Sequence, residues 1–585
     1  MKSAFSGQFC LSKRSRLKKT RQTSKSLIRR KKLMEYELRL MQTEAATGYF
    51  ACVPARKTDL ENMLAYICEH PLDEFMHKYL LETLGKSDES ALKDLMNRNN
   101  PAIQALIYEI CLLSRQFAEL KKAFDSSQIA LLSQYSPMIY IRSSLMADQS
   151  AHIAWNDIFE ANLINHKPLP SPDNAGLPIL FPDARLDSVS VKDIYQDMKT
   201  ISVPPYSRPD PADTAKMAIE KLKAINVLSG AEMRHHSSLS LCAMLRQWQM
   251  RISVKSGRHD YTLSGTQTAY GKGLDLDSAR VSYAMEIAER CSSFASFEAD
   301  AVVGYLRDYP LIYSDYNHLI QNGKSALNPE SLLPDTPYEN EPLYWLEGEN
   351  PNGSPVLIPA QCVFLFCNLD EISLFASPGS TGLASGNTME EAKVSALLEV
   401  FERDSESLGF YDPSRCFRLD GGFPRLAALL GSYREKGVDV IFQDITSEMG
   451  IPAYKCFVIA PDGEIVKGCG AHLDGRRAIL SALTETPWPY PYSPFSAKGP
   501  QDLPVIRFEE LPDYSTGHPA TDLQMLEKLL TANNHPPVYA DLRRKDLEIP
   551  VVRVIVPGME TSSERDRHSR ISPGRFAAYL RLYNR

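Results

Sequence analysis

A nine-residue pattern that occurs twice constrains this chain more than any other sequence feature. Residues 282–290 read SYAMEIAER and residues 395–403 read SALLEVFER, so both follow S-x-x-x-E-x-x-E-R. Positions i, i+4 and i+7 share one face of an α-helix, so each copy places a hydroxyl and two carboxylates in one row. The apolar, helix-favouring surroundings of both copies predict two similar helices in one fold.

Two such rows brought together would concentrate negative charge. The four carboxylates and two guanidinium groups belong to Glu286, Glu289, Glu399, Glu402, Arg290 and Arg403. Uncompensated carboxylates repel one another and raise each other's pKa. Mg²⁺ takes oxygen ligands, relieves such repulsion and commonly brings substrate phosphates with it. The residues alone therefore predict a site for a metal ion and a nucleotide. The alternative is a solvated salt-bridge face on each helix.

Length and composition describe a globular chain with more than one core. Its 585 residues exceed one ordinary domain, and 43% hydrophobic with 23% charged residues is typical of soluble proteins. No run approaches the roughly 18 uncharged apolar residues of a membrane helix. The eleven cysteines include no C-x-x-C pair, which indicates a reducing compartment and no zinc site. We therefore expect a cytoplasmic protein without a membrane partner.

The hydrophobic and charge patterns divide the chain into four parts. Residues 1–33 carry 12 Lys or Arg and no acid, and are interpreted as a disordered basic tail; the acidic remainder argues against nucleic acid as the main ligand. Residues 34–165 show helical spacing and predict an all-helical domain that binds a substrate or partner. The Pro-rich residues 166–195 predict a linker or a wrapping segment. Residues 196–585 alternate β-rich runs with helices, so we expect an α+β domain.

The expected elements of the last part surround the repeated pattern. The expected helices cover residues 212–227, 276–297, 388–408, 476–486 and 522–533, and the expected strands cover residues 356–367, 438–445, 453–460, 464–469 and 550–556. The turn at residues 461–463, Pro-Asp-Gly, predicts a hairpin between two of these strands.

Glycine-rich segments precede both glutamate helices. Residues 265–273 read GTQTAYGKG, which is not a Walker A motif in spacing or in its last residue. A Gly-Lys-Gly turn before a helix still offers backbone N–H groups and the Lys272 ammonium to phosphate. Residues 380–388 read STGLASGNT, whose small residues let the backbone approach a ligand while Asn387 or Thr388 caps the helix.

A third, truncated copy of the pattern follows near residue 481. Residues 481–485 read SALTE and repeat the Ser–Glu spacing, but residues 487–494 read PWPYPYSP and cannot continue a helix. We interpret the Pro/aromatic segment as a rigid surface loop, with a lid over a cleft as the alternative.

The repeated helices and the segments before them resemble the signature of the YcaO family. The resemblance rests on residues 381–403, on Gly271-Lys-Gly followed by residues 282–290, and on the ending at residues 541–558. It implies a mixed sheet with internally repeated glutamate helices, with ATP and Mg²⁺ as cofactors. It further implies an enzyme that phosphorylates a peptide-backbone amide oxygen while a nucleophile adds to the carbonyl carbon, giving an azoline or, with a sulfur donor, a thioamide.

The matching positions imply the following roles. The implied catalytic and Mg²⁺-binding residues are Glu286, Glu289, Glu399 and Glu402, with Glu391 and Glu485 as further metal ligands. The implied cofactor-binding residues are Lys272, Ser282, Arg290, Asn387, Glu391 and Arg403. The implied partners are a substrate peptide or protein and a TfuA-like protein, and a homodimer stays open.

The chain departs from the family pattern in two places. The third motif usually has an arginine four residues before its glutamate, whereas this chain has Ser481 before Glu485; Arg476 or Arg477 is a hypothetical substitute. Because an arginine aimed at phosphate raises rates by orders of magnitude, a catalytically impaired adaptor stays open as an alternative, as does a Mg²⁺–ATP ligase acting on carboxylates. Azoline-forming members often end in a Pro-x-Pro-x-Pro tail, whereas this chain ends RLYNR. Its Asp541-Leu and Pro-Gly segments more closely resemble the members that work with a TfuA-like partner in thioamide formation.

Overall fold

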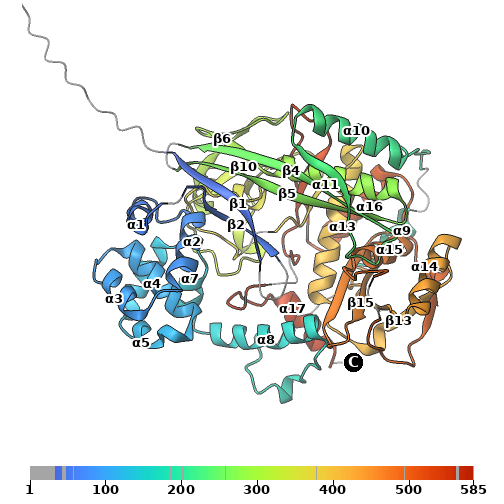
Figure 1. The fold of residues 1–585 in the computed structure, drawn as a ribbon, viewed down its shortest axis with the longest axis horizontal. Helices are drawn as coiled ribbons and strands as arrows, with labels where there is room; N and C mark the ends of the chain where they lie inside the picture. The colour runs from blue at the N-terminus through green and yellow to red at the C-terminus, as the bar shows by residue number, and fades with distance from the viewer. Residues whose placement is uncertain are drawn as a thin grey trace, which may run out of the picture. The chain divides into compact units, whose positions relative to one another are not determined.

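The computed structural model describes residues 33–42, 48–56, 58–184, 188–198, 203–256, 259–376, 379–492, 495–561 and 565–583. The predicted basic tail lies outside these residues, apart from Leu33. From residue 34 onward the chain forms one compact unit, and Figure 1 labels many of its elements.

Three sheets organise this unit. The first contains β1 (Met34–Gln42), β2 (Gly48–Pro54), β3 (Leu228–Arg234), β4 (Cys242–Lys255), β5 (Asp260–Gly273), β6 (Ser296–Glu298), β7 (Ala301–Val303) and β8 (Tyr309–Pro310), in the order β2-β1-β5-β4-β6-β7-β8 with β3 beside β4. The second contains β9 (Ile312–Ser314), β10 (Leu343–Glu349), β11 (Pro355–Pro359), β12 (Leu383–Ser385), β18 (Val538–Asp541) and β19 (Val551–Ile555), in the order β11-β10-β18-β19-β12 with β9 beside β10. The third contains β13 (Cys416–Asp420), β14 (Ile441–Asp444), β15 (Ala453–Ile459), β16 (Ile465–Ala471) and β17 (Val505–Arg507), in the order β16-β15-β14-β13-β17.

Helices cover these sheets and join them. They are α1 (Leu60–Glu69), α2 (Glu74–Leu84), α3 (Glu89–Met96), α4 (Pro101–Leu113), α5 (Ala118–Lys121), α6 (Ser126–Leu132), α7 (Tyr140–Leu145), α8 (Gln149–Asn165), α9 (Val191–Met198), α10 (Pro211–Ala224), α11 (Leu276–Ser293), α12 (Tyr316–Gln321), α13 (Met389–Leu408), α14 (Pro424–Glu435), α15 (Gly475–Glu485), α16 (Pro519–Ala532) and α17 (Pro573–Arg581). The predicted α+β class is confirmed. None of the described helices has the length and apolar character needed to span a bilayer.

Most elements expected around the repeated pattern are present. The five expected helices correspond to α10, α11, α13, α15 and α16, and β14, β15, β16 and β19 lie where strands were expected. The turn at Gly463 joins β15 and β16 as an antiparallel hairpin. The expected strand over residues 356–367 is wrong in its second half, because β11 ends at Pro359 and a short 3₁₀ turn follows.

The first residues of the predicted helical domain are strands, which corrects that prediction. β1 pairs antiparallel with β2 and parallel with β5, where Met34 lies opposite Tyr261. Tyr36 and Leu38 are buried on one face of β1, so its side chains alternate with the period of two that marks a strand. The helices begin only at α1, and they share one buried core with the sheet.

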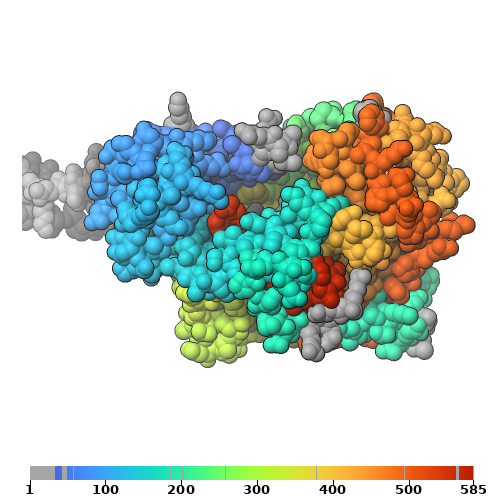
Figure 2. All heavy atoms as spheres, turned by 90° about the horizontal axis from the view of Figure 1, so that it is seen from below, coloured from blue at the N-terminus to red at the C-terminus, as the bar shows by residue number. Residues whose placement is uncertain are grey.

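The Pro-rich segment after α8 is packed against the rest of the unit. Figure 2 shows the teal residues of α8 and of the segment that follows it on the lower face, beside red C-terminal residues. The Trp155 indole N–H donates to the Pro178 carbonyl at 2.8 Å, and the Tyr579 hydroxyl donates to the Pro170 carbonyl at 2.8 Å. Trp155 also packs edge-to-face on Phe576 of α17. These contacts correspond to the wrapping alternative for this segment.

Candidate active site

Three strand–helix units with the same close packing hold the glutamates. β5 leads into α11, β12 into α13, and β16 into α15. At each junction a glycine lets the helix approach the strand. A Cβ on Gly271 would lie 1.9 Å from the Ala279 carbonyl oxygen, and one on Gly470 would lie 2.3 Å from the Ala478 carbonyl oxygen. At the junction before α13, a Cβ on Gly386 would lie 2.5 Å from a backbone nitrogen of that helix. These glycines bring the helices close to the strands.

The Gly-Lys-Gly segment is part of a strand and not the turn that the sequence predicted. Residues 271–273 are the end of β5, where Lys272 pairs with Ala243 of β4. Both glycines pack against α11. A side chain at either position would collide with that helix. Before α13, by contrast, the cap prediction is confirmed, since the Thr388 side chain accepts the Glu391 backbone N–H at 3.2 Å.

One pocket of about 620 Å³ opens along α11 and the start of the Pro/aromatic segment. Its lining includes the predicted residues Lys272, Ser282, Glu286, Glu289 and Glu485. The Lys272 ammonium lies 2.7 Å from a Glu485 carboxylate oxygen, which joins β5 to α15. The Glu286 carboxylate accepts the Tyr270 backbone N–H at 3.0 Å. Tyr270 and His235, which was assigned no ligand role, add an aromatic wall.

A second pocket of about 460 Å³ lies along α13. Its lining includes Tyr206, Arg208, Glu391, Glu399, Glu402, His472 and Arg477. Glu391 accepts the Asn387 backbone N–H and side-chain amide, each at 2.9 Å, and the Tyr206 hydroxyl at 2.7 Å. Burial raises the pKa of Glu391, but its hydrogen bonds and an ion pair with Arg208 hold that pKa below the ordinary value.

The carboxylates of the two rows come within electrostatic range of each other. Burial raises the pKa of Glu289 well above the ordinary range, and the charge of Glu399 raises it further. Burial raises the pKa of Glu402 to about 8, despite Arg403 at 2.8 Å, with the charges of Glu399 and Glu485 adding to the effect. Carboxylates of α11 and α13 thus lie close together with raised pKa values, whereas Glu485 of α15 is paired with Lys272.

Arginines separate these carboxylates. Arg290 lies 3.8 Å from both Glu286 and Glu289, and Arg403 pairs with Glu402 and, at 2.7 Å, with Glu406. Within the described residues no three His, Cys, Asp or Glu side chains converge closely enough to hold one ion. Mg²⁺ is usually bound by one or two carboxylates together with substrate phosphates. The oxygen-only donors therefore fit a Mg²⁺–nucleotide complex better than a cation held by protein alone.

The structure also distinguishes the two hypothetical substitutes for the third-motif arginine. Ser481 is half-buried against Gly470 and lines neither pocket. Arg476 is engaged by Asp474 at 2.9 Å and by Asp513. Arg477 lines the pocket along α13. Of the two hypothetical substitutes, only Arg477 faces this pocket.

Arg553 is a charged residue next to the site that the sequence analysis assigned no role. It is 8% exposed in the middle of the apolar strand β19, and its guanidinium donates to the Cys362 and Gly379 carbonyl oxygens at 3.1 and 2.8 Å. Burial lowers its pKa to about 10, while the charge of Glu399 opposes that shift. A charged residue inside an apolar run of β-branched residues was the available sequence signal.

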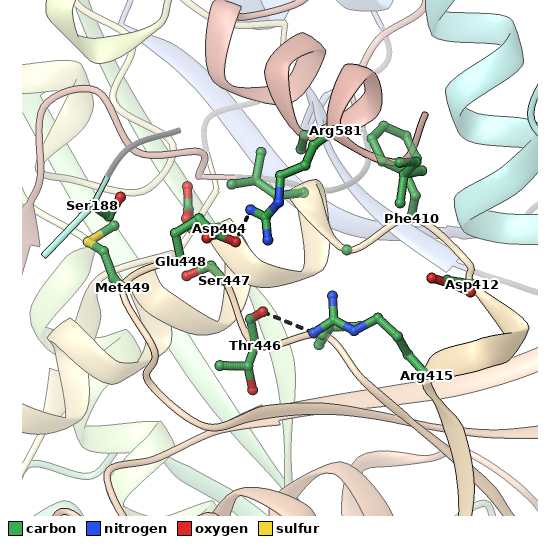
Figure 3. A pocket seen from close by; sticks show the side chains of 15 residues that line it. Ser188, Asp404, Phe410, Asp412, Arg415, Thr446, Ser447, Glu448, Met449 and Arg581 are labelled. Atoms are coloured by element: carbon green, nitrogen blue, oxygen red, sulfur yellow. Dashed lines mark hydrogen bonds and ion pairs between the residues drawn. The ribbon is translucent and has the colours of Figure 1, made fainter. Parts of the chain in front are cut away.

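Another pocket lies on the opposite side of α13 and contains none of the predicted residues. Figure 3 shows Arg581 and Arg415 reaching into it from different elements, with Asp404 on its wall. Arg581 is ion-paired with Glu448, and Arg415 donates to the Thr446 carbonyl at 3.1 Å. Asp404 follows Glu402 by two residues, about 200° further around the helix. We therefore place this pocket outside the candidate site.

The described residues of the Pro/aromatic segment pack mostly against the rest of the compact unit. Trp488 is 4% exposed, and Tyr490 packs edge-to-face on Tyr433 of α14, while Tyr492 is 67% exposed. Only Pro487 lines the pocket along α11. The contacts agree with a rigid loop at the described positions, and its last two residues lie outside the described chain.

Comparison with known proteins gives one family. The family model described as YcaO cyclodehydratase, ATP- and Mg²⁺-binding, matches residues 270–487 and 491–560. An uncharacterized protein of Methanothermobacter thermautotrophicus is 30% identical over 396 residues, covering 60% of this chain and 94% of that protein. An uncharacterized protein of Rhizobium leguminosarum bv. trifolii, in the tfuA 3′ region, is 27% identical over 252 residues, covering 40% of this chain and 56% of that protein.

Two solved structures are also similar. A heterocyclase in complex with substrate and cofactor has a TM-score of 0.47 and 18% identity, covering 66% of this chain and 60% of that one. YcaO from Methanopyrus kandleri bound with AMPPCP and Mg²⁺ has a TM-score of 0.43 and 22% identity, covering 62% of this chain and 94% of that one. The matched family region contains every predicted site residue, from Lys272 to Glu485, but neither Tyr206 nor Arg208.

Proposed function

The chain belongs to the YcaO family, and from this premise we propose that it activates a peptide-backbone amide for azoline or thioamide formation. The family binds ATP and Mg²⁺, which are therefore the cofactors of the chain. The observation that carries the proposal is the meeting of carboxylates from α11 and α13, where the charge of Glu399 raises the pKa of Glu289 and burial raises that of Glu402 to about 8. Such perturbed groups in an open pocket mark candidate functional sites.

In this proposal the glutamates hold the metal ion and the cations hold phosphate. Mg²⁺–ATP supplies a phosphoryl group that turns the amide oxygen into a good leaving group. Glu286, Glu289, Glu399 and Glu402 would hold Mg²⁺, with Glu391 and Glu485 at the edges of the same surface. Lys272, Arg290, Arg403 and Asn387 would hold the nucleotide, together with Ser282. The pairs that now join Lys272 to Glu485 and Arg403 to Glu402 keep these side chains oriented.

The substrate and partner follow from chemistry and from the relatives. An amide-activating site needs a peptide or protein substrate, and we assign its binding to the helical part from α1 to α8. The Rhizobium relative is described by its place in a tfuA 3′ region, which supports a TfuA-like partner and thioamide formation. We expect this work to take place in the cytoplasm.

One observation favours a second function, a catalytically impaired adaptor. Ser481 carries no cation, and it lines neither pocket. An adaptor of this kind would bind nucleotide or peptide without turnover.

Calorimetric titration of ATP with and without Mg²⁺ tests both functions. We expect Mg²⁺-dependent binding by the wild-type chain, its loss in the Glu399→Ala/Glu402→Ala variant, and its retention in Glu390→Ala, an exposed carboxylate on the same helix. Multiple-turnover ATP hydrolysis that disappears in Glu399→Ala supports the enzyme, and binding without turnover supports the adaptor. A folded wild-type chain that binds no ATP would refute both.

A further inference from the structure

The pocket along α13 receives two arginines from segments far apart in sequence. Arg208 comes from the extended residues before α10, and Arg477 comes from the first turn of α15. Both line this pocket together with His472, and burial and the positive charges of Arg477 and Arg208 lower the pKa of His472 to about 4. The two guanidinium groups and the Glu399 and Glu402 carboxylates therefore line one pocket.

Arg208 belongs to a segment that is hydrogen-bonded to α13 and to the residues before it. Prolines at positions 204, 205, 209 and 211 favour an extended backbone here. The Tyr206 hydroxyl donates to Glu391 at 2.7 Å, and the Thr214 hydroxyl donates to the Asn387 side-chain oxygen at 3.0 Å. The Arg208 side chain stays 63% exposed while it lies 3.3 Å from Glu391. The segment thus fixes its backbone on the site and leaves the guanidinium accessible.

Arg477 also keeps its guanidinium accessible, unlike its neighbour Arg476. Arg476 is held in ion pairs with Asp474 and Asp513. Arg477 is exposed, lines the pocket, and has no ion pair within the described residues. It precedes Glu485 by eight residues, about two turns along α15. A guanidinium that has no ion-pair partner and lies near buried carboxylates can bind an anion that brings its own cation to those carboxylates.

We propose that Arg208 and Arg477 form a clamp for the phosphate chain of a nucleoside di- or triphosphate in this pocket. This inference rests on the proposed function, and it names two cationic residues that the sequence left unassigned or open. Guanidinium groups bind phosphate oxygens in a bidentate manner, and two of them on opposite segments would close around the chain. Arg208 lies outside the matched family region, so this half of the clamp belongs to the chain's own preceding segment.

The test compares ATP with AMP by calorimetry at fixed Mg²⁺. For Arg208→Ala and Arg477→Ala we expect the ATP affinity to fall on the order of 10- to 100-fold each, because each variant loses charge-assisted hydrogen bonds. The AMP affinity should change much less, and Arg477→Lys should recover part of the loss. Arg476→Ala is the matched control and should bind ATP like the wild type.

Three results would overturn the clamp. Unchanged ATP affinity in both alanine variants would refute it while leaving the proposed function intact. An equal loss of ATP and AMP affinity would assign the arginines a structural role. A folded wild-type chain that binds no ATP would remove the proposed function and the clamp together.

Discussion

Replacing Glu402 with glutamine is expected to make the folded chain more stable at alkaline pH. Glu402 is 15% exposed, and its pKa is raised from 4.5 to about 8 by burial and by neighbouring carboxylates. The folded state therefore binds more protons than the unfolded state between these two values, so the free energy of unfolding falls as pH rises through this window. The difference corresponds to about 5 kcal/mol, which is an upper value for the gain in Glu402→Gln above pH 8.

Urea unfolding of the wild type and of Glu402→Gln between pH 5 and 9, without Mg²⁺, measures this gain. The two curves should nearly coincide at pH 5 and separate as the pH rises. Glu406→Gln is the matched control, one turn along α13. Burial raises the pKa of Glu406, but Lys467 and Arg403 outweigh it and hold that pKa below the ordinary value. Its substitution should therefore destabilise the chain at neutral pH, by about 3 kcal/mol.

The reasoning fails if Glu402→Gln destabilises the chain at pH 9 or leaves its pH dependence unchanged. The same variant should bind Mg²⁺–ATP more weakly than the wild type. A gain in stability coupled to a loss of binding is the expected relation where a site stores uncompensated charge.

Three further predictions concern packing and pairing. Gly271→Ala should lower the free energy of unfolding by about 1–3 kcal/mol or more, since its Cβ collides with α11. Gly431→Ala, at a position in α14 with open space around it, should raise the free energy of unfolding by roughly 0.5–1 kcal/mol. Urea titration measures both changes. Phe159→Ala, fully buried against α17, should cost about 3–5 kcal/mol in the same assay. Lys272→Ala and Glu485→Ala should weaken ATP binding non-additively because they form one ion pair, so additive losses in the double variant would contradict the pairing.

The parts of the fold carried by periodic helices were predictable from sequence. α13 starts one residue after the predicted helix and ends at the same position, because its cap at Thr388 and its apolar face are both local signals. β1 was missed, although its residues Tyr36 and Leu38 alternate with charged ones, because the neighbouring helical runs dominated the interpretation of residues 34–165. The sequence does not distinguish a glycine that binds phosphate from one that lets a helix pack closely, such as Gly271. Only the packing in the structure distinguishes the two.

The site was predictable only where its residues repeat a pattern. Glu286 and Glu399 follow from the spacing, whereas Arg208 comes from a Pro-rich segment with no motif and Arg553 from an apolar strand. Their placement depends on contacts between residues more than 170 positions apart, which spacing within one element does not encode.

The pairing of β1 with β5 has a consequence for synthesis on the ribosome. The partners Met34 and Tyr261 are separated by more than 200 positions. At about 5–20 residues per second, β1 emerges some tens of seconds before β5. During that interval the hairpin of β1 and β2 has an open hydrogen-bonding edge and only marginal stability of its own. The nascent chain must therefore pass through a state in which that edge is available to other strands, and its yield should depend on chaperones that bind early.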